Sequence, residues 1–242
     1  MQILTHSLLL LSNFLFLTFG QTFYEIKYTY SQTLEIDDDM RRAYPPEILE
    51  QIREASNMSY EFLLYTNEQE SIIKLQPKIM NTQSELGLEI EPDLKWAYKN
   101  LNENYIVNLI VFNKKYYVKD SLPNLNWQKT NEQKEILGYQ TQKYLYEDKN
   151  QIIEIWCANE IKIPNGPLNF RGNENLILES TISNKNGANL SYHFIATEIN
   201  HPVEYNFKKE MPQKMINKQD FEKIFSDYKK TEKEMQEGTH KD

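Results

Sequence analysis

Strand-length runs in which apolar and polar residues alternate constrain the fold of this chain more than any other feature of its sequence. The first run lies at residues 23–30, where large apolar side chains fall at every second position: Tyr24, Ile26, Tyr28 and Tyr30. Glu25 and Lys27 occupy positions between them. A period of two places the two kinds of side chain on opposite faces of a β-strand, so we predict a strand with one buried face.

Three pairs of similar runs follow, and each pair is joined by a short polar loop. They are residues 58–65 with 71–75, residues 105–112 with 115–119, and residues 135–147 with 151–158. Short loops of this kind join antiparallel strands in hairpins, whereas parallel strands need crossovers of a dozen or more residues. We therefore predict a mainly β fold, built on a large, curved antiparallel meander sheet that is an open sheet or a half barrel.

Two segments have the spacing of helices instead. Pro46 suits the first turn of a short helix after the first strand, and one face of this helix is apolar: Ile48, Leu49, Ile52 and Ala55. Near the C-terminus, Asp220 precedes a second apolar stripe: Phe221, Ile224, Phe225 and Tyr228. We expect this C-terminal helix to dock on the sheet. We also expect residues 78–92 to form a connecting loop and residues 229–242 a charged, flexible tail.

The N-terminus has the pattern of an export signal. Residues 1–20 contain no Asp, Glu, Lys or Arg, and their apolar centre is too short to span a bilayer comfortably. Thr18-Phe19-Gly20 supplies small residues at the positions that a signal peptidase reads, which would leave Gln21 as the first mature residue. The alternative is an uncleaved membrane anchor. We predict a signal peptide at residues 1–20 and a single β-rich domain at residues 21–228.

The predicted location follows from this signal. No cysteine stands after the cleavage site, which excludes a lipid anchor on the new N-terminus. No later apolar run approaches the length that spans a membrane, so we expect no transmembrane segment in the mature chain. We predict an exported protein of the cell envelope, either periplasmic or associated with the outer membrane.

Composition excludes several classes of function. The chain has 242 residues and a net charge of −8, and therefore lacks the basic surface with which general nucleic-acid binders displace counterions, so we expect no nucleic-acid partner. Its single cysteine, Cys157, can form neither an intramolecular disulfide nor a thiolate zinc cage. Cys157 alternates with Ile153 and Ile155, as a small core residue would. The chain has only seven glycines and no phosphate-cradling loop, and we predict no cofactor.

Two groups of residues could hold a metal ion. His193, Glu198 and His201 could approach one another across a turn, although their spacing matches no metal motif. Asp37-Asp38-Asp39 could bind a hard cation, but such a run more often forms a solvated loop, here at the end of the first strand. We interpret the histidines as ordinary strand residues and expect no catalytic residue and no metal.

An ordered set of short motifs occupies residues 125–180. In sequence order they are Leu125-Asn126-Trp127, Gly138-Tyr139, Trp156 followed by Ile161-Lys162-Ile163-Pro164, then Gly166-Pro167, and the box Gly172-Asn173-Glu174-Asn175-Leu176-Ile177. In this order the motifs resemble the GLPGLI family of exported proteins from Bacteroidota. Asn173, Glu174 and Asn175 stand where that family has Leu, Pro and Gly. The resemblance implies an exported, β-rich protein with no assigned reaction and no known catalytic residues.

We interpret these motif residues as structural, because they are turn formers and core formers without reactive groups. Gly166-Pro167 would turn the chain out of one strand, Gly172 would permit a second bend, and Leu176 and Ile177 would restart a strand in the core. Asn175 could replace the glycine of a tight turn, because asparagine tolerates a left-handed backbone. The alternative interpretation is a binding loop.

Two hypotheses on function remain. The first is a non-enzymatic binding or protein-interaction module, whose partner is an envelope protein or an apolar small molecule held by the sheet. The abundance of tyrosine and phenylalanine on the strands motivates it. The second is a metal-assisted hydrolase that uses His193 and His201. Geometry separates the two hypotheses, because the hydrolase requires both imidazoles at one point in a cleft.

Overall fold

The computed structural model describes residues 22–56, 58–77, 92–185 and 189–238. The predicted signal peptide and nearly all of the predicted 78–92 loop lie outside these residues. The strands are β1 (Thr22–Glu35), β2 (Ser59–Thr66), β3 (Glu70–Leu75), β4 (Trp96–Asn100), β5 (Tyr105–Val111), β6 (Lys115–Ser121), β7 (Gln128–Ile136), β8 (Tyr139–Glu147), β9 (Gln151–Ala158), β10 (Ile177–Asn184), β11 (Asn189–Glu204) and β12 (Ile216–Asn217). The helices are α1 (Asp38–Ala43), α2 (Pro46–Ser56) and α3 (Lys218–Gly238), and Phe207–Lys209 forms one 3₁₀ turn.

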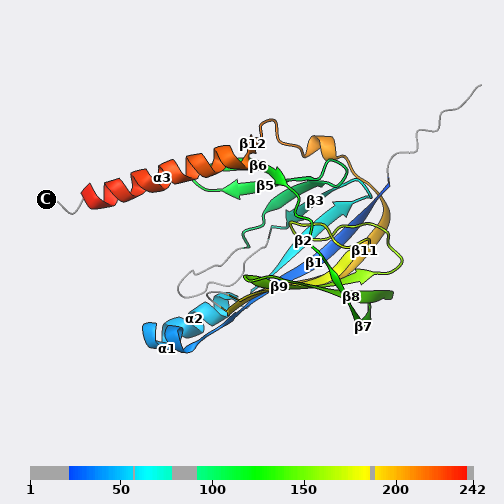
Figure 1. Ribbon diagram of the computed structural model, residues 1–242, viewed down its shortest axis with the longest axis horizontal. Helices are drawn as coiled ribbons and strands as arrows, with labels where there is room; N and C mark the ends of the chain where they lie inside the picture. Colours follow the sequence, from blue (N-terminus) through cyan, green and yellow to red (C-terminus); the bar gives the residue numbers. More distant parts are fainter. Residues whose placement is uncertain (1–21, 57, 78–91, 186–188, 239–242) are drawn as a thin grey trace, which may run out of the picture.

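All twelve strands belong to one open sheet, in the order β12-β6-β5-β4-β3-β2-β1-β11-β10-β9-β8-β7. Two meanders build it: β1 to β6 run outward in one direction, and β7 to β11 return from the opposite edge to pair with β1. Every pairing is antiparallel except that of the short β12 with β6. The predicted mainly β fold, with a helix after the first strand and a C-terminal helix, is confirmed (Figure 1).

The larger core lies on one face of the sheet, which carries Tyr28, Phe62 and Ile155 and which we call the inner face. The predicted alternation in β1 produces this arrangement: Ile26 and Tyr28 are fully buried and Tyr30 is nearly so. A smaller core of six residues lies on the outer face: Phe23, Ile72, Trp96, Tyr98, Val107 and Phe207. Parts of β3, β4 and β5 are therefore buried on both faces, which suits their aromatic and β-branched residues.

The aspartate run after β1 forms a helix rather than the predicted solvated loop. Asp37 is the N-cap of α1, and its side chain accepts a hydrogen bond from the backbone N–H of Met40 at 2.8 Å. Asp38 and Asp39 then stand in the first turn, where negative charge stabilises the positive end of the helix dipole. The prediction was wrong because acidic residues favour helix starts as well as loops.

The predicted strand at residues 135–147 is interrupted by a tight turn. Leu137 and Gly138 both have positive φ, at 53° and 82°, and they join β7 to β8 in a two-residue hairpin. Positive φ at both central residues is the conformation that matches the twist of a hairpin. Leucine is not a turn former, which is why the turn was missed.

Helix α3 continues through ten residues that we predicted to be a flexible tail, because it ends at Gly238 and not near Tyr228. Lysine, glutamate and glutamine dominate residues 229–237, and these are good helix formers, whereas glycine commonly ends a helix. The first half of α3 contacts the sheet: Phe221 packs on Tyr116, and Phe225 packs on Phe112. The rest of α3 projects away from the sheet (Figure 1). No helix in the described part of the chain is both long and apolar enough to cross a membrane.

Candidate functional site

The chain covers the inner face of its own sheet with residues 159–176, which we call the inner segment. This segment connects the neighbouring strands β9 and β10, for which a short loop would suffice. Its five buried apolar side chains join the larger core: Ile161, Ile163, Leu168, Phe170 and Leu176. The inner segment therefore occupies much of the space that a ligand of the bare sheet would fill.

Polar contacts hold the inner segment across the sheet. Lys99 Nζ, from β4, donates to the carbonyl oxygens of Gly166 at 2.7 Å and Leu168 at 2.9 Å. Asn165 Nδ2 donates to Thr66 Oγ1, at the end of β2, at 2.9 Å. The segment thus reaches from β9 over β1 to β4, and its position is fixed by backbone and side-chain groups with specific partners.

Most of the motif residues lie in the inner segment or against it. Trp127 Nε1 donates to the carbonyl of Arg171 at 3.3 Å, and the indole packs on Phe170 with ring centroids 5.4 Å apart. Pro164 and Pro167 lie within the segment, and Leu176 and Ile177 are fully buried at the start of β10. These residues fold the segment onto the sheet.

The glycines of this region act differently from the interpretation given above. Strand β9 ends at Ala158, well before Gly166, so Gly166 does not turn the chain out of a strand. A Cβ atom at Gly166 would lie 2.6 Å from Cβ of Ile177, and one at Gly172 would lie 3.1 Å from the carbonyl oxygen of Asn175. Both glycines therefore permit close packing. Asn175 is buried without a left-handed backbone, and its Oδ1 accepts from Lys162 Nζ at 3.3 Å.

Three motif residues lie outside this arrangement. Gly138 forms the β7–β8 turn, and Tyr139 begins β8 partly buried against the larger core. Trp156, on β9, is covered by the ammonium group of Lys134, whose Nζ lies 4.2 Å from the ring centroid. A cation over the face of an indole is a stabilising contact, and it does not require a ligand.

An aromatic cavity of about 360 Å³ lies on the inner face beside the inner segment. Four rings line it, together with aliphatic and a few polar side chains; the lining residues are Tyr30, Pro92, Asp93, Leu94, Gln151, Ile153, Leu168, Asn169, Phe170, Ile182, Tyr192 and Phe194. The rings of Tyr30 and Phe194 are in contact, with centroids 4.8 Å apart. A mostly apolar hollow of this volume with a few polar groups has the character of a small-molecule site.

Among the described residues that line this cavity, Asp93 is the one carboxylate. Burial, the Tyr192 hydroxyl and the Asp93 carboxylate together raise the pKa of Tyr30, and burial and Asp93 also raise the pKa of Tyr192. Both phenols therefore stay neutral and keep their protons at physiological pH. The cavity thus offers an apolar wall, two phenol hydroxyls and one anionic acceptor.

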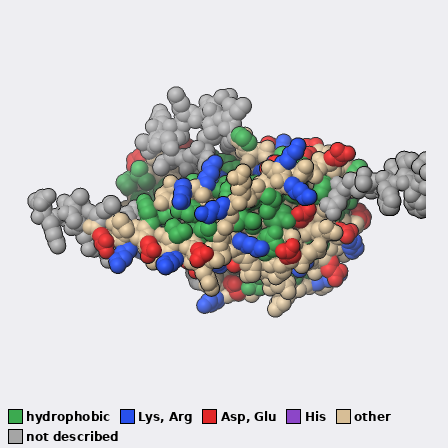
Figure 2. All heavy atoms as spheres, turned by 90° about the horizontal axis from the view of Figure 1, so that it is seen from above, with side chains coloured by type: hydrophobic (Ala, Val, Ile, Leu, Met, Phe, Trp, Pro, Cys, Tyr) green, Lys and Arg blue, Asp and Glu red, His purple; other side chains and the backbone are tan. Residues whose placement is uncertain are grey.

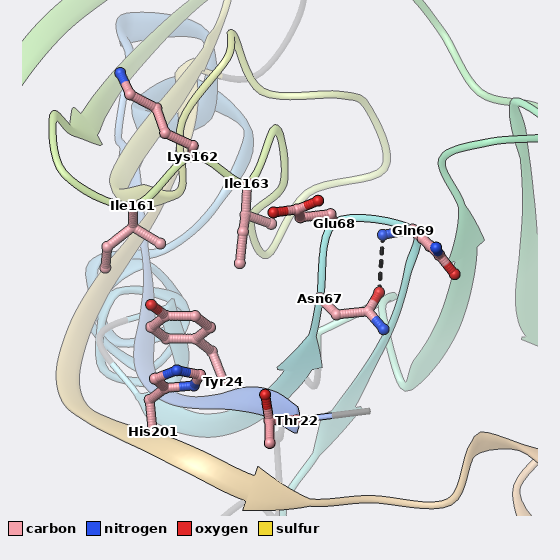
Figure 3. Close-up of a pocket in the computed structure, with 9 residues that line it drawn as sticks. All are labelled: Thr22, Tyr24, Asn67, Glu68, Gln69, Ile161, Lys162, Ile163 and His201. Atoms are coloured by element: carbon pink, nitrogen blue, oxygen red, sulfur yellow. Dashed lines mark hydrogen bonds between the residues drawn. The ribbon is translucent and has the colours of Figure 1, made fainter. Parts of the chain in front are cut away.

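A second, more polar cavity of about 380 Å³ lies between the start of β1, the β2–β3 turn and the inner segment (Figure 3). The rings of Tyr24 and His201 stack on one another, with centroids 3.8 Å apart and planes at 6°. His201 Nδ1 lies 3.1 Å from the carbonyl oxygen of Phe23. Because a carbonyl only accepts, Nδ1 carries the proton of this hydrogen bond. Glu68 and Ile163 also face this cavity, while Lys162 points away from it (Figure 3).

The predicted alternative metal site does not assemble. The alternative required a turn that brings His193, Glu198 and His201 together, but residues 189–204 form one continuous strand, β11. At ~3.3 Å per residue, the two histidines are separated by more than ~20 Å. Within the described residues, no group of three or more His, Cys, Asp or Glu could hold a metal ion, the Asp37-Asp38-Asp39 run included.

Each histidine has another partner instead. His193 Nε2 lies 3.4 Å from Glu179 Oε1, and Lys134 Nζ lies 2.6 Å from the other oxygen of Glu179. Burial opposes ionisation of Glu179, but the hydrogen bonds from His193 and Lys134 lower its pKa below the ordinary value. His201 belongs to the stack with Tyr24. These are contacts of strand histidines, and they bring no hydrolytic pair together.

Cys157 lies in the larger core with no exposed surface. Burial raises the pKa of its thiol to about 12. A nucleophilic or metal-binding cysteine needs the thiolate form, so Cys157 is a core residue.

The sequence patterns did not predict that Lys99 is buried or that the inner segment covers the sheet. The signal was present in Trp96-Ala97-Tyr98-Lys99-Asn100, where a strand pattern puts a lysine in phase with Ala97 and therefore on the inner face. The aromatic cavity was foreseen only as an apolar ligand site on the sheet. Its wall from the inner segment, Leu168 to Phe170, depends on packing that no local pattern specifies.

Comparison with known proteins gives a fold and no activity. No protein-family model and no curated protein matches the sequence. Two crystal forms of PNGF-II match the structure with a TM-score of 0.51 and 17% identity, over 81% and 82% of this chain and 30% and 31% of that protein. The chain therefore spans about a third of the length of PNGF-II, and at this identity the likeness concerns the fold alone.

A further match is the LolA superfamily protein NE2245 from Nitrosomonas europaea, with a TM-score of 0.34 and 8% identity over 80% of this chain and 92% of that protein. A TM-score this low does not establish a shared fold.

Proposed function

We propose that this chain is a non-enzymatic binding protein of the cell envelope, and that it holds a small, largely apolar molecule in the aromatic cavity. The observation that carries the proposal is the cavity of about 360 Å³ that four aromatic rings line on the inner face, beside the inner segment. Its export rests on the sequence of residues 1–20, and its membership of the GLPGLI family rests on the ordered motifs. Both are part of the proposal.

The polar groups of the cavity define the ligand further. Asp93 is an acceptor, while the amides of Gln151 and Asn169 and the phenols of Tyr30 and Tyr192 can donate and accept; the rest of the wall is apolar. A ligand with an apolar body and a hydrogen-bond-donating end, such as a hydroxyl or ammonium group, would satisfy both Asp93 and the apolar wall. An anionic end would be repelled by Asp93.

A neutral apolar dye tests the proposal. Purified protein titrated with N-phenyl-1-naphthylamine should show saturable fluorescence enhancement at one site per chain. Ile182→Trp places a larger side chain in the cavity from a partly exposed position, and we expect it to weaken the binding by about tenfold or more. Its control is Ile152→Trp, because Ile152 alternates with the cavity residue Ile153 and so lies on the opposite face of the sheet.

The polar end is tested separately. Asp93→Asn should weaken the displacement of the dye by a long-chain primary amine, and should leave the affinity for the dye itself unchanged. Absence of saturable dye binding, or equal binding in both tryptophan variants, would contradict the proposal.

A further inference from the structure

The two edges of the sheet are unequal. On β7, one edge strand, most residues are exposed and charged or polar, and the pairing with β8 is irregular between Lys129 and Gln133. Charges and bulges at an edge discourage pairing with another chain. This edge is protected in the ordinary way.

The other edge, at β6, is only partly paired. Strand β12 contributes two residues, which pair with Val118 and Lys119 of β6. Within the described part of the chain, no strand pairs with residues 115–117 on that side. In an edge strand, alternate N–H and C=O groups point outward and can pair with one more strand.

A cavity of about 560 Å³ lies beside this part of β6, between the strand, residues 212–216 and the start of α3. We call it the β6 groove, and it is lined by Lys114, Lys115, Tyr116, Tyr117, Pro212, Gln213, Lys214, Ile216 and Ile224. The salt bridge between Lys218 Nζ and Asp120 Oδ2, at 2.8 Å, holds the start of α3 beside β6. The groove is therefore a fixed feature of the fold, and it continues the line of β12 along the unpaired part of β6.

Exposed apolar side chains gather at the same end of the molecule. Among the described residues, seven large hydrophobic side chains are exposed, and five of them lie on or beside the groove and α3: Val111, Met215, Ile224, Phe225 and Tyr228. Figure 2 looks down on this side and shows apolar side chains beside the projecting helix, with several lysines or arginines among them. A concentration of this kind marks an interaction surface.

The charge of the groove restricts its partner. Three lysines line it, Lys114, Lys115 and Lys214, and none of its lining residues is acidic. This is the opposite of the whole chain, whose net charge is −8. A second copy of the chain paired edge to edge would bring like charges together, whereas an acidic segment would be attracted.

We propose that β6 takes up an extended acidic segment of another protein as an additional strand of the sheet. Backbone hydrogen bonds to residues 115–117 supply the pairing, and alternate side chains of the segment meet the apolar side chains of Tyr116 and Ile224 on the face that α3 covers. Its carboxylates lie on the other face of the added strand, beside Lys115. This surface is separate from the aromatic cavity, and the two proposals stand independently.

A synthetic strand tests this inference. The probe is a fluorescein-labelled peptide of eight residues that alternates glutamate with valine, and binding is measured by fluorescence polarisation with the full chain. We expect saturable binding, weaker by about tenfold in Lys115→Glu and unchanged in the matched variant Lys129→Glu on the opposite edge. The same peptide N-methylated at alternate residues cannot donate the backbone hydrogen bonds, and it should not bind. Hydrogen exchange of the β6 amides should slow when the unmethylated peptide is bound.

Other outcomes overturn the inference. Absence of saturable peptide binding would contradict it. Equal binding of the N-methylated peptide, or an equal loss of affinity in Lys115→Glu and Lys129→Glu, would show that charge or apolar contact alone is responsible. A dimer in sedimentation that Ile224→Asp converts to a monomer would assign the groove to a second copy of the chain.

Discussion

The ammonium group of Lys99 donates a hydrogen bond to the carbonyl oxygen of Gly166 at 2.7 Å, and thereby joins β4 to a segment 67 positions later in the chain. Lys99 is 1% exposed, and burial lowers its pKa from 10.5 to about 7. No ion pair with an acid offsets this burial among the described contacts; the partners of Lys99 are the carbonyls of Gly166 and Leu168. The inner segment is therefore held by a group whose charge changes near neutral pH.

Lys99→Met should change how stability depends on pH. Between pH 7 and 10.5 the unfolded chain keeps the Lys99 proton and the folded chain releases it, so the free energy of unfolding of the wild type rises with pH in this range. The slope approaches about 1.4 kcal/mol per pH unit for one proton. We expect the free energy of unfolding of the wild type, measured in urea, to rise relative to that of the variant by about 2–3 kcal/mol between pH 6 and pH 9. At pH 9 we expect the variant to be less stable by about 1–3 kcal/mol, because the two carbonyls lose their donor.

The matched control for this experiment is Lys129→Met, at an exposed position on β7. It should leave the pH dependence of the wild type unchanged. If the free energy of unfolding of Lys99→Met differs from that of the wild type by the same amount at pH 6 as at pH 9, Lys99 does not titrate in this range.

Gly166→Ala should destabilise the fold more than Gly172→Ala. The added Cβ at Gly166 would lie 2.6 Å from Cβ of Ile177, which cannot move without the backbone of β10. The added Cβ at Gly172 meets the nearest atoms at 3.1–3.2 Å, which small shifts relieve. Overpacking of a well-packed core costs about 1–3 kcal/mol of the free energy of unfolding. We expect the cost of Gly166→Ala at the upper end of this range and a smaller cost for Gly172→Ala. Urea unfolding of the two variants measures the order, and the reverse order would contradict the packing role of Gly166.

Cys157 should be unreactive in the folded chain. Its thiol is buried and its pKa is about 12, so at pH 8 almost no thiolate is present and no reagent reaches it. A disulfide reagent such as 5,5′-dithiobis(2-nitrobenzoate) should react with it only in proportion to the unfolded population in urea. A cysteine introduced as Lys129→Cys, at an exposed position, provides the control and should react at once. Fast reaction of Cys157 in buffer alone would contradict its place in the core.

Patterns local in the sequence predicted much of the fold. The alternation at residues 23–30 predicted β1, and the loops after Tyr65, Phe112 and Glu147 predicted three hairpins, because a hairpin depends on residues close together in the chain. The strand order was beyond this reasoning. The pairing of Thr22 with Glu204 brings the two meanders together, and nothing near either residue specifies it.

The candidate site was predicted only in outline. An apolar ligand site on the sheet followed from the aromatic residues, but its walls depend on the inner segment, whose position is set by distant partners such as Lys99 and Thr66. The metal alternative failed for a related reason. Spacing alone could not distinguish a turn between His193 and His201 from a continuous strand.

The β7–β8 turn carries a residue that the sequence does not lead one to expect, and replacing it should stabilise the chain. Leu137 has a φ of 53° and is 45% exposed, so its side chain contributes little packing while its backbone adopts the left-handed conformation. That conformation costs an ordinary residue about 1–2 kcal/mol, and asparagine adopts it more readily. Asn-Gly is also the preferred pair at the centre of such hairpins. We therefore expect Leu137→Asn to raise the free energy of unfolding by about 0.5–1 kcal/mol and the melting temperature by roughly 1–4 °C.

Leu137→Ala removes the same exposed side chain without easing the backbone, and its melting temperature should not rise. A gain in Leu137→Ala equal to that in Leu137→Asn would assign the effect to the exposed leucine side chain, and a loss in Leu137→Asn would mean that the side chain packs better than its exposure indicates.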